Sequence, residues 1–191
     1  MTTIKGVVLF HGAGSDRDHS SLKAIEKALK PLKVKRVNFP YRKAGKPFPD
    51  RTPVLLDCVH KEVNAAAKKW GVNVSEIGIG GRSMGGRMCS MAVAGAECEP
   101  LAAGALILIS YPLHPPGKPE KLRVEHLPKI KIPTLFIHGT RDSFATPEEL
   151  RSNAATIRGR KTFHFIDNGR HELKGADDEI ASTIKNWIAK L

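Results

Sequence analysis

The residues best suited to chemistry are Ser83 and the glycines beside it, in the run Gly-Arg-Ser-Met-Gly at 81–85. An apolar run at 77–80 precedes this pentapeptide and predicts a buried strand, and residues 86–94 predict a helix. A serine in a sharp strand-to-helix turn sits on strained backbone with its hydroxyl exposed, and glycines on either side let strand and helix approach. The pattern therefore predicts that Ser83 is a nucleophile.

Asp142 and His171 are the expected partners of this serine. A serine hydroxyl attacks efficiently only when a histidine takes its proton and a carboxylate orients that histidine. Apolar runs at 134–138 and 162–166 predict two strands, and Asp142 and His171 follow them in the loops beyond. Because the carboxyl ends of parallel strands meet at one edge of a sheet, we expect the three side chains to lie together there.

Other acids and histidines are weaker candidates. Asp57 falls inside a predicted helix, and Asp167 is too close to His171 in sequence to orient it, so Asp142 is preferred. His164, His171 and Asp167 could instead form a metal site, but His164 lies on an apolar strand and is expected to be an ordinary structural histidine. We therefore expect neither a metal nor a cofactor. Two further histidines are expected to serve the backbone or the core: His11 and His138.

A small-residue loop at 11–14 follows the apolar run at 7–10 directly. Backbone N–H groups in such a loop can hold the negative charge that develops on a carbonyl oxygen during attack. The expected donors are Ala13 and Met84, the residue after the nucleophile, with Gly14 as the less favoured choice. Together these parts predict acyl transfer through a Ser-His-Asp triad.

Five segments carry a family resemblance. They are residues 11–14 (His-Gly-Ala-Gly), 81–87, 138–142 (His-Gly-Thr-Arg-Asp), 169–171 (Gly-Arg-His) and the proline-rich stretch 111–119. These segments resemble signatures of compact, dienelactone-hydrolase-like α/β-hydrolases, and most closely a small predicted-hydrolase family that includes a testis-expressed protein and the hydrolase-like domain of a chromatin-complex subunit.

The resemblance spans essentially the whole chain and implies an ester-type serine hydrolase, either a carboxylesterase or a thioesterase. One departure is that dienelactone hydrolases proper use a cysteine where this chain has Ser83. The nearer family also includes members that look non-catalytic. A protein-interaction module that retains the hydrolase scaffold is therefore the alternative function.

Strands and helices alternate along the chain, which predicts an α/β fold with a minimal, doubly wound parallel sheet of about six strands and helices on both faces. The resemblance implies the strand order 2-1-3-4-5-6. The length of 191 residues fits a single domain over residues 1–191 and is short for an α/β-hydrolase, so no large cap is expected. A loop is expected at 40–51. The expected strands are 7–10, 34–39, 77–80, 105–109, 134–138 and 162–166; the expected helices are 20–30, one capped by Thr52 and ended by Gly71, 86–94, one opened by Thr146, and one opened by Asp177.

Residues 111–132 contain five prolines and no obvious long helix. They are expected to form an ordered flap beside Ser83, or else a plain surface crossover. The residues expected to contact substrate are Gly12, Gly14, Tyr41, Arg42, Tyr111, Pro112 and Phe144, with His114 a weaker candidate.

Lys and Arg number 31 against 19 Asp and Glu, a formal net charge of +12. Most of these cations lie on helix faces opposite the apolar stripe, so we expect a solvated surface and no specific nucleic-acid binding. Six lie on loops at the predicted active edge and suggest an anionic substrate steered by a positive rim. For Arg82, Arg141 and Arg170, bracing of the loops is favoured instead, whereas Arg42 and Lys43 are expected to be freer to face a ligand. The sixth is Arg17.

The three cysteines, Cys58, Cys89 and Cys98, show no paired spacing and are expected to be reduced thiols. The first strand is expected to begin so early that no signal peptide precedes it, and no apolar run reaches membrane-spanning length. We therefore expect a cytoplasmic monomer or homodimer that acts on a small acyl substrate without a membrane partner, and the positive rim suggests that this substrate is an anion.

Overall fold

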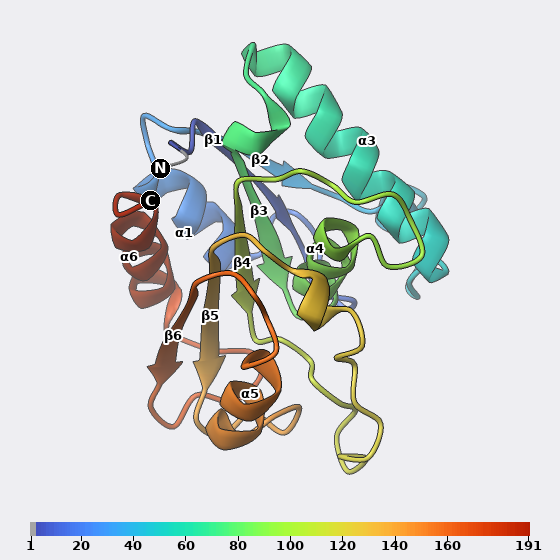
Figure 1. The fold of residues 1–191 in the computed structure, drawn as a ribbon, viewed down its shortest axis with the longest axis vertical. Coiled ribbons are helices and arrows are strands. Elements are labelled where there is room, and N and C mark those ends of the chain that lie inside the picture. The colour runs from blue at the N-terminus through green and yellow to red at the C-terminus, as the bar shows by residue number, and fades with distance from the viewer. Residues whose placement is uncertain (1–2) are drawn as a thin grey trace.

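Six strands form one parallel sheet in the order β2-β1-β3-β4-β5-β6 in the computed structural model, which describes residues 3–191 (Figure 1). Both the α/β fold and this strand order were predicted from the sequence, and both are confirmed. The strands are β1 Gly6–Phe10, β2 Lys33–Val37, β3 Ile77–Arg82, β4 Ala105–Ile109, β5 Thr134–Gly139 and β6 Lys161–Ile166.

The two faces of the sheet follow from the two-residue period of its strands. On β1, Val8 and Phe10 pack with α3 and α4, whereas Val7 and Leu9 pack with α1 and α6 on the opposite face. Figure 1 shows these two helical layers. The helices are α1 Ser20–Ala28, α2 Pro40–Lys43, α3 Thr52–Trp70, α4 Met84–Ala94, α5 Pro147–Ala154 and α6 Asp177–Ile188, with short 3-10 turns η1 Val74–Glu76 and η2 Leu127–Lys129.

β2 lies at one edge of the sheet and carries basic residues that a central strand could not bury. Lys35 pairs with Glu62 of α3 (2.7 Å), and Arg36 pairs with Glu26 of α1 (2.7 Å). Charged side chains on an edge strand also oppose pairing with another chain. Part of the positive charge of the protein is thus accounted for by the architecture.

Several helix ends match the sequence. Gly71 ends α3 in the left-handed conformation (φ 66°), and Thr146 and Glu149 form a reciprocal capping box at α5. The prediction that Thr52 caps α3 is wrong, because Arg51 is the cap residue and makes no side-chain bond. The loop expected at 40–51 begins with a helical turn, α2, since Pro40 presets a helical φ at its first position.

All three cysteines are unpaired, and two of them are buried. Burial raises the pKa of the Cys58 thiol to about 11 and raises that of Cys89 well above its usual value. Neither is therefore a reactive thiolate at neutral pH. Within residues 3–191, no helix is long and apolar enough to cross a membrane.

Candidate active site

Ser83 occupies the turn between β3 and α4 with a backbone conformation that L-residues rarely adopt (φ 47°, ψ −116°). Its N–H donates to the Ile109 carbonyl at the end of β4 (2.8 Å), and its carbonyl accepts from the Arg87 N–H in α4 (3.0 Å). These two bonds hold the strained residue between strand and helix. The side chain is left half-buried at the carboxyl edge of the sheet.

The glycines beside Ser83 are required by backbone packing. A Cβ atom on Gly81 would lie 2.0 Å from the Phe10 carbonyl oxygen, and one on Gly85 would lie 2.5 Å from the same oxygen and 2.6 Å from that of His11. No side chain fits at such distances. The turn is thus pressed directly against the end of β1, where the small-residue loop 11–14 begins.

Ser83, His171 and Asp142 form a continuous hydrogen-bonded chain. His171 Nε2 lies 2.9 Å from Ser83 Oγ, and His171 Nδ1 lies 3.0 and 2.9 Å from the two carboxylate oxygens of Asp142. With its Nδ1–H donated to the carboxylate, the imidazole leaves Nε2 free to accept the serine proton. The Asp142 side chain is fully buried, whereas that of His171 is 16% exposed.

The loops that carry Asp142 and His171 are tied together by backbone contacts. A Cβ on Gly139 would lie 2.2 Å from the Gly169 carbonyl oxygen, and the Arg141 N–H donates to that same oxygen (2.8 Å). Buried Arg82 spans to the histidine loop and donates to the carbonyls of Glu172 (2.6 Å) and His171 (3.4 Å). The loop-bracing role favoured for Arg82 is confirmed.

Asp142 is oriented by more than His171. The Phe144 N–H donates to its Oδ1 (2.9 Å), and His138 Nε2 lies 3.5 Å from its Oδ2 while donating to the Ala145 carbonyl (3.0 Å). Burial lowers the pKa of His138 and keeps it neutral. The Phe144 ring stacks on that of His171, with centroids 3.9 Å apart. Phe144, expected at the substrate site, thus covers one face of the imidazole.

The loop at 11–14 lies beside the serine, since a Cβ on Gly12 would be 3.7 Å from Ser83 Cβ. Within residues 3–191, the N–H groups of Ala13 and Met84 donate to no protein acceptor, so both are available to an oxyanion. His11 donates from Nδ1 to the Gly12 carbonyl (2.7 Å) and accepts from the Phe39 N–H (3.2 Å). This histidine serves the backbone, as expected, and burial lowers its pKa.

Three of the residues expected to contact substrate, two tyrosines and a proline, lie inside the protein instead. Tyr41 is 1% exposed and donates from its hydroxyl to the Ala13 carbonyl (2.7 Å), so it braces the oxyanion loop from behind. Tyr111 is also 1% exposed, and it donates to the Arg123 carbonyl (2.8 Å). Burial raises its pKa to about 12. Pro112 is buried as well, whereas Gly14 is exposed.

At this edge of the sheet, the basic residues that are bonded to the protein and those that are free are not the ones expected from the sequence. Arg42 donates from Nε to the Ser15 carbonyl (2.8 Å), and Lys43 pairs with Glu62 (2.8 Å), so neither is free, contrary to the prediction. Arg141 and Arg170 are exposed, and in the described part of the chain their guanidinium groups bond no protein atom. The cations open to a ligand are therefore these two, and the prediction that their side chains brace the loops is wrong. Arg17 lies near Asp18 (3.7 Å).

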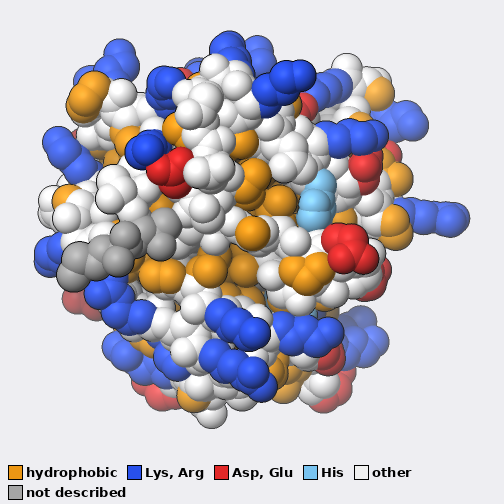
Figure 2. All heavy atoms as spheres, turned by 45° about the horizontal axis from the view of Figure 1, so that its top comes forward, with side chains coloured by type: hydrophobic (Ala, Val, Ile, Leu, Met, Phe, Trp, Pro, Cys, Tyr) orange, Lys and Arg blue, Asp and Glu red, His pale blue; other side chains and the backbone are white. Residues whose placement is uncertain are grey.

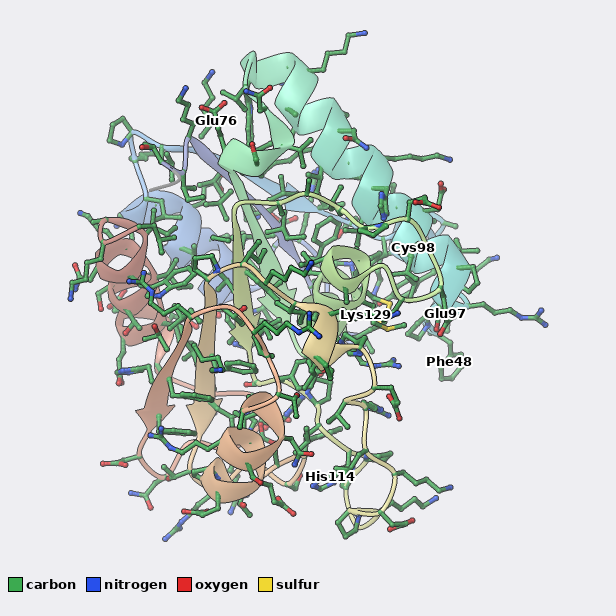
Figure 3. All side chains as sticks on the ribbon, in the orientation of Figure 1. Phe48, Glu76, Glu97, Cys98, His114 and Lys129 are labelled. Carbon is green, nitrogen blue, oxygen red and sulfur yellow. The ribbon has the colours of Figure 1, made fainter. Side chains whose placement is uncertain are left out.

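The segment 111–132 is anchored to α4 through a second serine–histidine contact. Its His126 Nε2 lies 2.7 Å from Ser90 Oγ, deep in the protein and without a carboxylate partner. Near the start of the segment, the backbone N–H of His114, which Figure 3 labels, donates to the Phe144 carbonyl (3.2 Å). The segment is thus a braced flap whose start abuts the residue stacked on His171.

The His126 anchor predicts a pH dependence of stability. Burial lowers the pKa of this histidine from 6.5 to about 4, so between these values the unfolded chain binds a proton that the folded protein does not, and stability falls as the pH drops. The contribution is about 2 kcal/mol between about pH 7 and pH 5. Urea denaturation at several pH values measures the free energy of unfolding. As the pH drops, this free energy should fall less steeply for His126→Gln than for wild type. An equal dependence on pH in the two proteins would contradict the lowered pKa of His126.

His164 belongs to the alternative metal site considered from the sequence. It lies on β6, the edge strand, and bonds Glu179 (2.7 Å), as an ordinary surface histidine does. In residues 3–191, no three His, Cys, Asp or Glu side chains are grouped as metal ligands would be. The chemistry available at this edge is that of the Ser83–His171–Asp142 chain.

This fold and this arrangement define an α/β-hydrolase. Residues 3–190 match the family model described as "Alpha/beta hydrolase domain". The chain belongs to that family.

Solved structures of several hydrolases share the fold at low sequence identity. Est1E from Butyrivibrio proteoclasticus superposes with a TM-score of 0.73 at 15% identity, covering 100% of this chain and 89% of that one. An alpha-beta serine hydrolase homologue from Coxiella burnetii gives 0.74 at 14% identity, covering 97% and 86%. A dienelactone hydrolase from Anabaena variabilis gives 0.70 at 18% identity, covering 98% and 87%. The dienelactone-hydrolase-like architecture expected from the sequence is thereby confirmed.

Proposed function

We propose that this protein is a serine hydrolase that cleaves a small ester or thioester through an acyl-enzyme. The observation that carries the proposal is the hydrogen-bonded chain Ser83–His171–Asp142, with 2.9 Å between His171 Nε2 and Ser83 Oγ. A scaffold kept only for protein interaction would not need this chain, a strained serine and two unengaged N–H groups at one place.

The reaction proceeds in two halves. Ser83 Oγ attacks the carbonyl carbon as its proton passes to His171 Nε2, while Asp142 stabilises the imidazolium and the N–H groups of Ala13 and Met84 hold the oxyanion. Collapse of this intermediate breaks the bond to the leaving group, which takes the proton from His171. Water then gives a proton to His171, attacks the acyl carbon, and releases the acid as Ser83 regains its proton.

The relatives support the hydrolase class without naming a substrate. Est1E and the dienelactone hydrolase share the fold, and a fold alone does not determine a substrate. Membership of the testis-expressed and chromatin-complex family stays a prediction, as do a cytoplasmic location and a monomeric or homodimeric state. Carboxylesterase or thioesterase action is the reaction that the site supports best.

Labelling with a fluorophosphonate probe, read by intact mass, tests the proposal. We expect one adduct per chain on the wild type and none on Ser83→Ala or His171→Ala, because phosphonylation needs an activated serine. Circular dichroism of both variants is the control for folding. A well-folded wild type without an adduct would contradict the proposal and favour the interaction-module function.

Arg141 and Arg170 predict a preference for anionic esters. With 4-nitrophenyl butyrate as the neutral substrate and mono-4-nitrophenyl glutarate as the anionic one, the ratio of their kcat/KM values should favour the anion at low salt. We expect the ratio to fall about three- to tenfold at high salt or in the double variant Arg141→Gln/Arg170→Gln. Lys27→Gln is the control, because it removes one positive charge from an exposed position on α1, away from the site. If the ratio changes neither with salt nor in the double variant, Arg141 and Arg170 do not attract an anionic substrate.

A further inference from the structure

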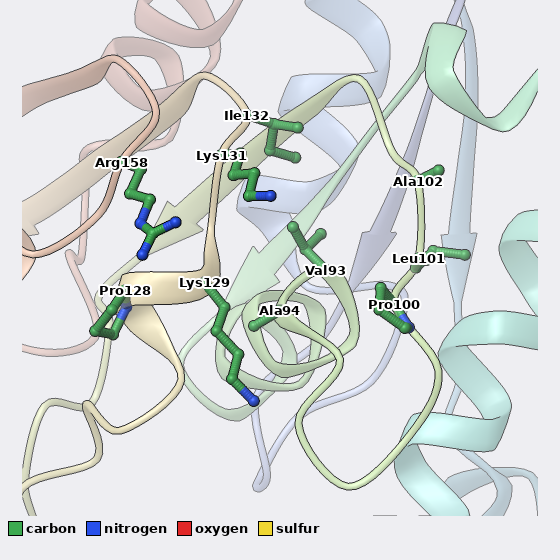
Figure 4. Close-up of a pocket in the computed structure, with 10 residues that line it drawn as sticks. All are labelled: Val93, Ala94, Pro100, Leu101, Ala102, Pro128, Lys129, Lys131, Ile132 and Arg158. Carbon is green, nitrogen blue, oxygen red and sulfur yellow. The ribbon is translucent and has the colours of Figure 1, made fainter.

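A hollow of about 480 Å³ lies far from the triad, where α4 ends and β4, β5 and β6 begin (Figure 4). Since α4 starts next to Ser83, this hollow is at the opposite end of the helix and at the amino edge of the sheet. In Figure 4, α4 provides the floor between a wall from the loop before β4 and a wall from η2 and the segments before β5 and β6. Val93 and Ala94 of α4 and Leu101 give it apolar surface, and Lys129, Lys131 and Arg158 give it charge.

Backbone bonds hold both walls in place. The Leu101 N–H donates to the Ala92 carbonyl (2.9 Å), which fixes the loop before β4 on the end of α4. On the other side, the N–H groups of Arg158 and Gly159 donate to the Ile130 carbonyl (3.0 and 3.2 Å). The hollow is therefore preformed, and a ligand would not have to order it.

The lining combines an apolar floor with three cations and no acid. Seven of its ten residues are apolar, and the other three are Lys129, Lys131 and Arg158. Within residues 3–191, no carboxylate lies within ion-pair distance of these three side chains, and none of them makes a side-chain hydrogen bond. Elsewhere many cations are engaged, as Lys35, Arg36 and Lys43 are. Glu97 and Glu125 line a neighbouring hollow together with Lys129, and within residues 3–191 neither acid lies within ion-pair distance of it; Figure 3 labels Glu97 and Lys129.

The surface around this end of the sheet has the same character. Figure 2, which brings the upper end of Figure 1 forward, shows hydrophobic side chains gathered near the centre of that face with Lys and Arg around them. Three like charges around one hollow repel each other, and an anion placed among them removes that repulsion. A highly charged polyanion would gain nothing from the apolar floor.

We propose that this hollow binds an amphiphilic carboxylate: an aliphatic chain that lies on Val93, Ala94 and Leu101, with its carboxylate in the positive field of Lys129, Lys131 and Arg158. The volume is within the range of sites for small organic ligands. The chain would gain from burial against the floor, and the carboxylate from the positive charge of the three cations around the hollow. The site is separate from the triad and does not depend on the proposed reaction.

Sodium decanoate added to 15N-labelled protein tests the proposal by NMR. We expect saturable shifts of the amides of Val93, Ala94, Leu101, Ala102 and Ile132 below the micellar concentration. The dissociation constant should rise at least about tenfold in Lys129→Gln/Arg158→Gln, and also at high salt. Ala102→Trp, at an exposed position of the rim, should block the hollow without removing a charge.

Matched ligands and variants separate the outcomes. Decanol should bind at least about tenfold more weakly than decanoate, and decyltrimethylammonium more weakly still. Lys27→Gln/Lys185→Gln, two exposed cations on α1 and α6, should leave the affinity unchanged. Shifts confined to residues around Ser83 would show binding at the triad only and overturn the proposal. Equal affinity of decanoate for wild type and Lys129→Gln/Arg158→Gln would overturn it as well.

Discussion

Ser83→Ala is expected to lower kcat/KM for 4-nitrophenyl acetate by about 10⁴-fold or more while the fold stays intact. The substitution removes only Oγ, which bonds nothing in the described residues except His171. The backbone of the turn keeps its bonds to Ile109 and Arg87. Steady-state kinetics on purified wild type and variant, with a thermal unfolding curve for each, measure both parts of the expectation.

Ser90→Ala is the matched control for this experiment. Ser90, within α4, is also a serine whose hydroxyl contacts a histidine, His126, at 2.7 Å. That pair has no carboxylate and is buried, so its loss should reduce stability and leave kcat/KM within about tenfold of wild type. If Ser83→Ala retained most of the activity, or Ser90→Ala abolished it in folded protein, Ser83 would not be the nucleophile.

Gly81→Ala is expected to destabilise the protein by more than about 3 kcal/mol. Its new Cβ would lie 2.0 Å from the Phe10 carbonyl oxygen, on the backbone of a neighbouring central strand that cannot move without breaking the sheet. The measurement is the free energy of unfolding from urea denaturation. Where the yield of folded protein is too small, the soluble fraction on expression is the readout.

Gly78→Ala, on the same strand, is the control. Its Cβ would meet Val7, Ile4 and Ala105 at ordinary contact distances of 3.6–3.8 Å. Alanine there should change the free energy of unfolding by no more than about 1 kcal/mol in either direction. If the two substitutions changed the free energy of unfolding by similar amounts, the close approach of β1 to Gly81, just before the turn that holds Ser83, would not limit stability.

The parallel sheet and the edge on which the candidate site lies followed from local patterns, whereas the strand order was implied by the family resemblance. Short apolar runs between helical patterns indicate parallel strands, and the loops after such strands must converge. This reasoning placed Ser83, Asp142 and His171 near one another although 88 and 29 residues separate the histidine from its two partners. Helix ends set by a single glycine or a capping box, as at Gly71 and Thr146, were equally readable.

The sequence failed where a side chain's surroundings come from distant parts of the chain. Tyr41 and Tyr111 stand next to strand ends, as pocket residues often do, yet both are turned inward by bonds to Ala13 and Arg123. Arg42 and Lys43 looked free on a loop, but they are engaged by Ser15 and Glu62. Burial and pairing depend on which elements pack together, and no local pattern contains that information.

The sequence by itself therefore determined the class of fold, the residue types of the candidate triad and the need for small residues around the serine. These depend on periodicity and on backbone sterics within a few residues. Only the tertiary structure decided which arginines brace loops and which stay open, which tyrosines are buried behind the site, and where three cations surround an apolar hollow. Each of these is a matter of distance between residues remote in sequence, and such distances are set by the packing of helices on the sheet.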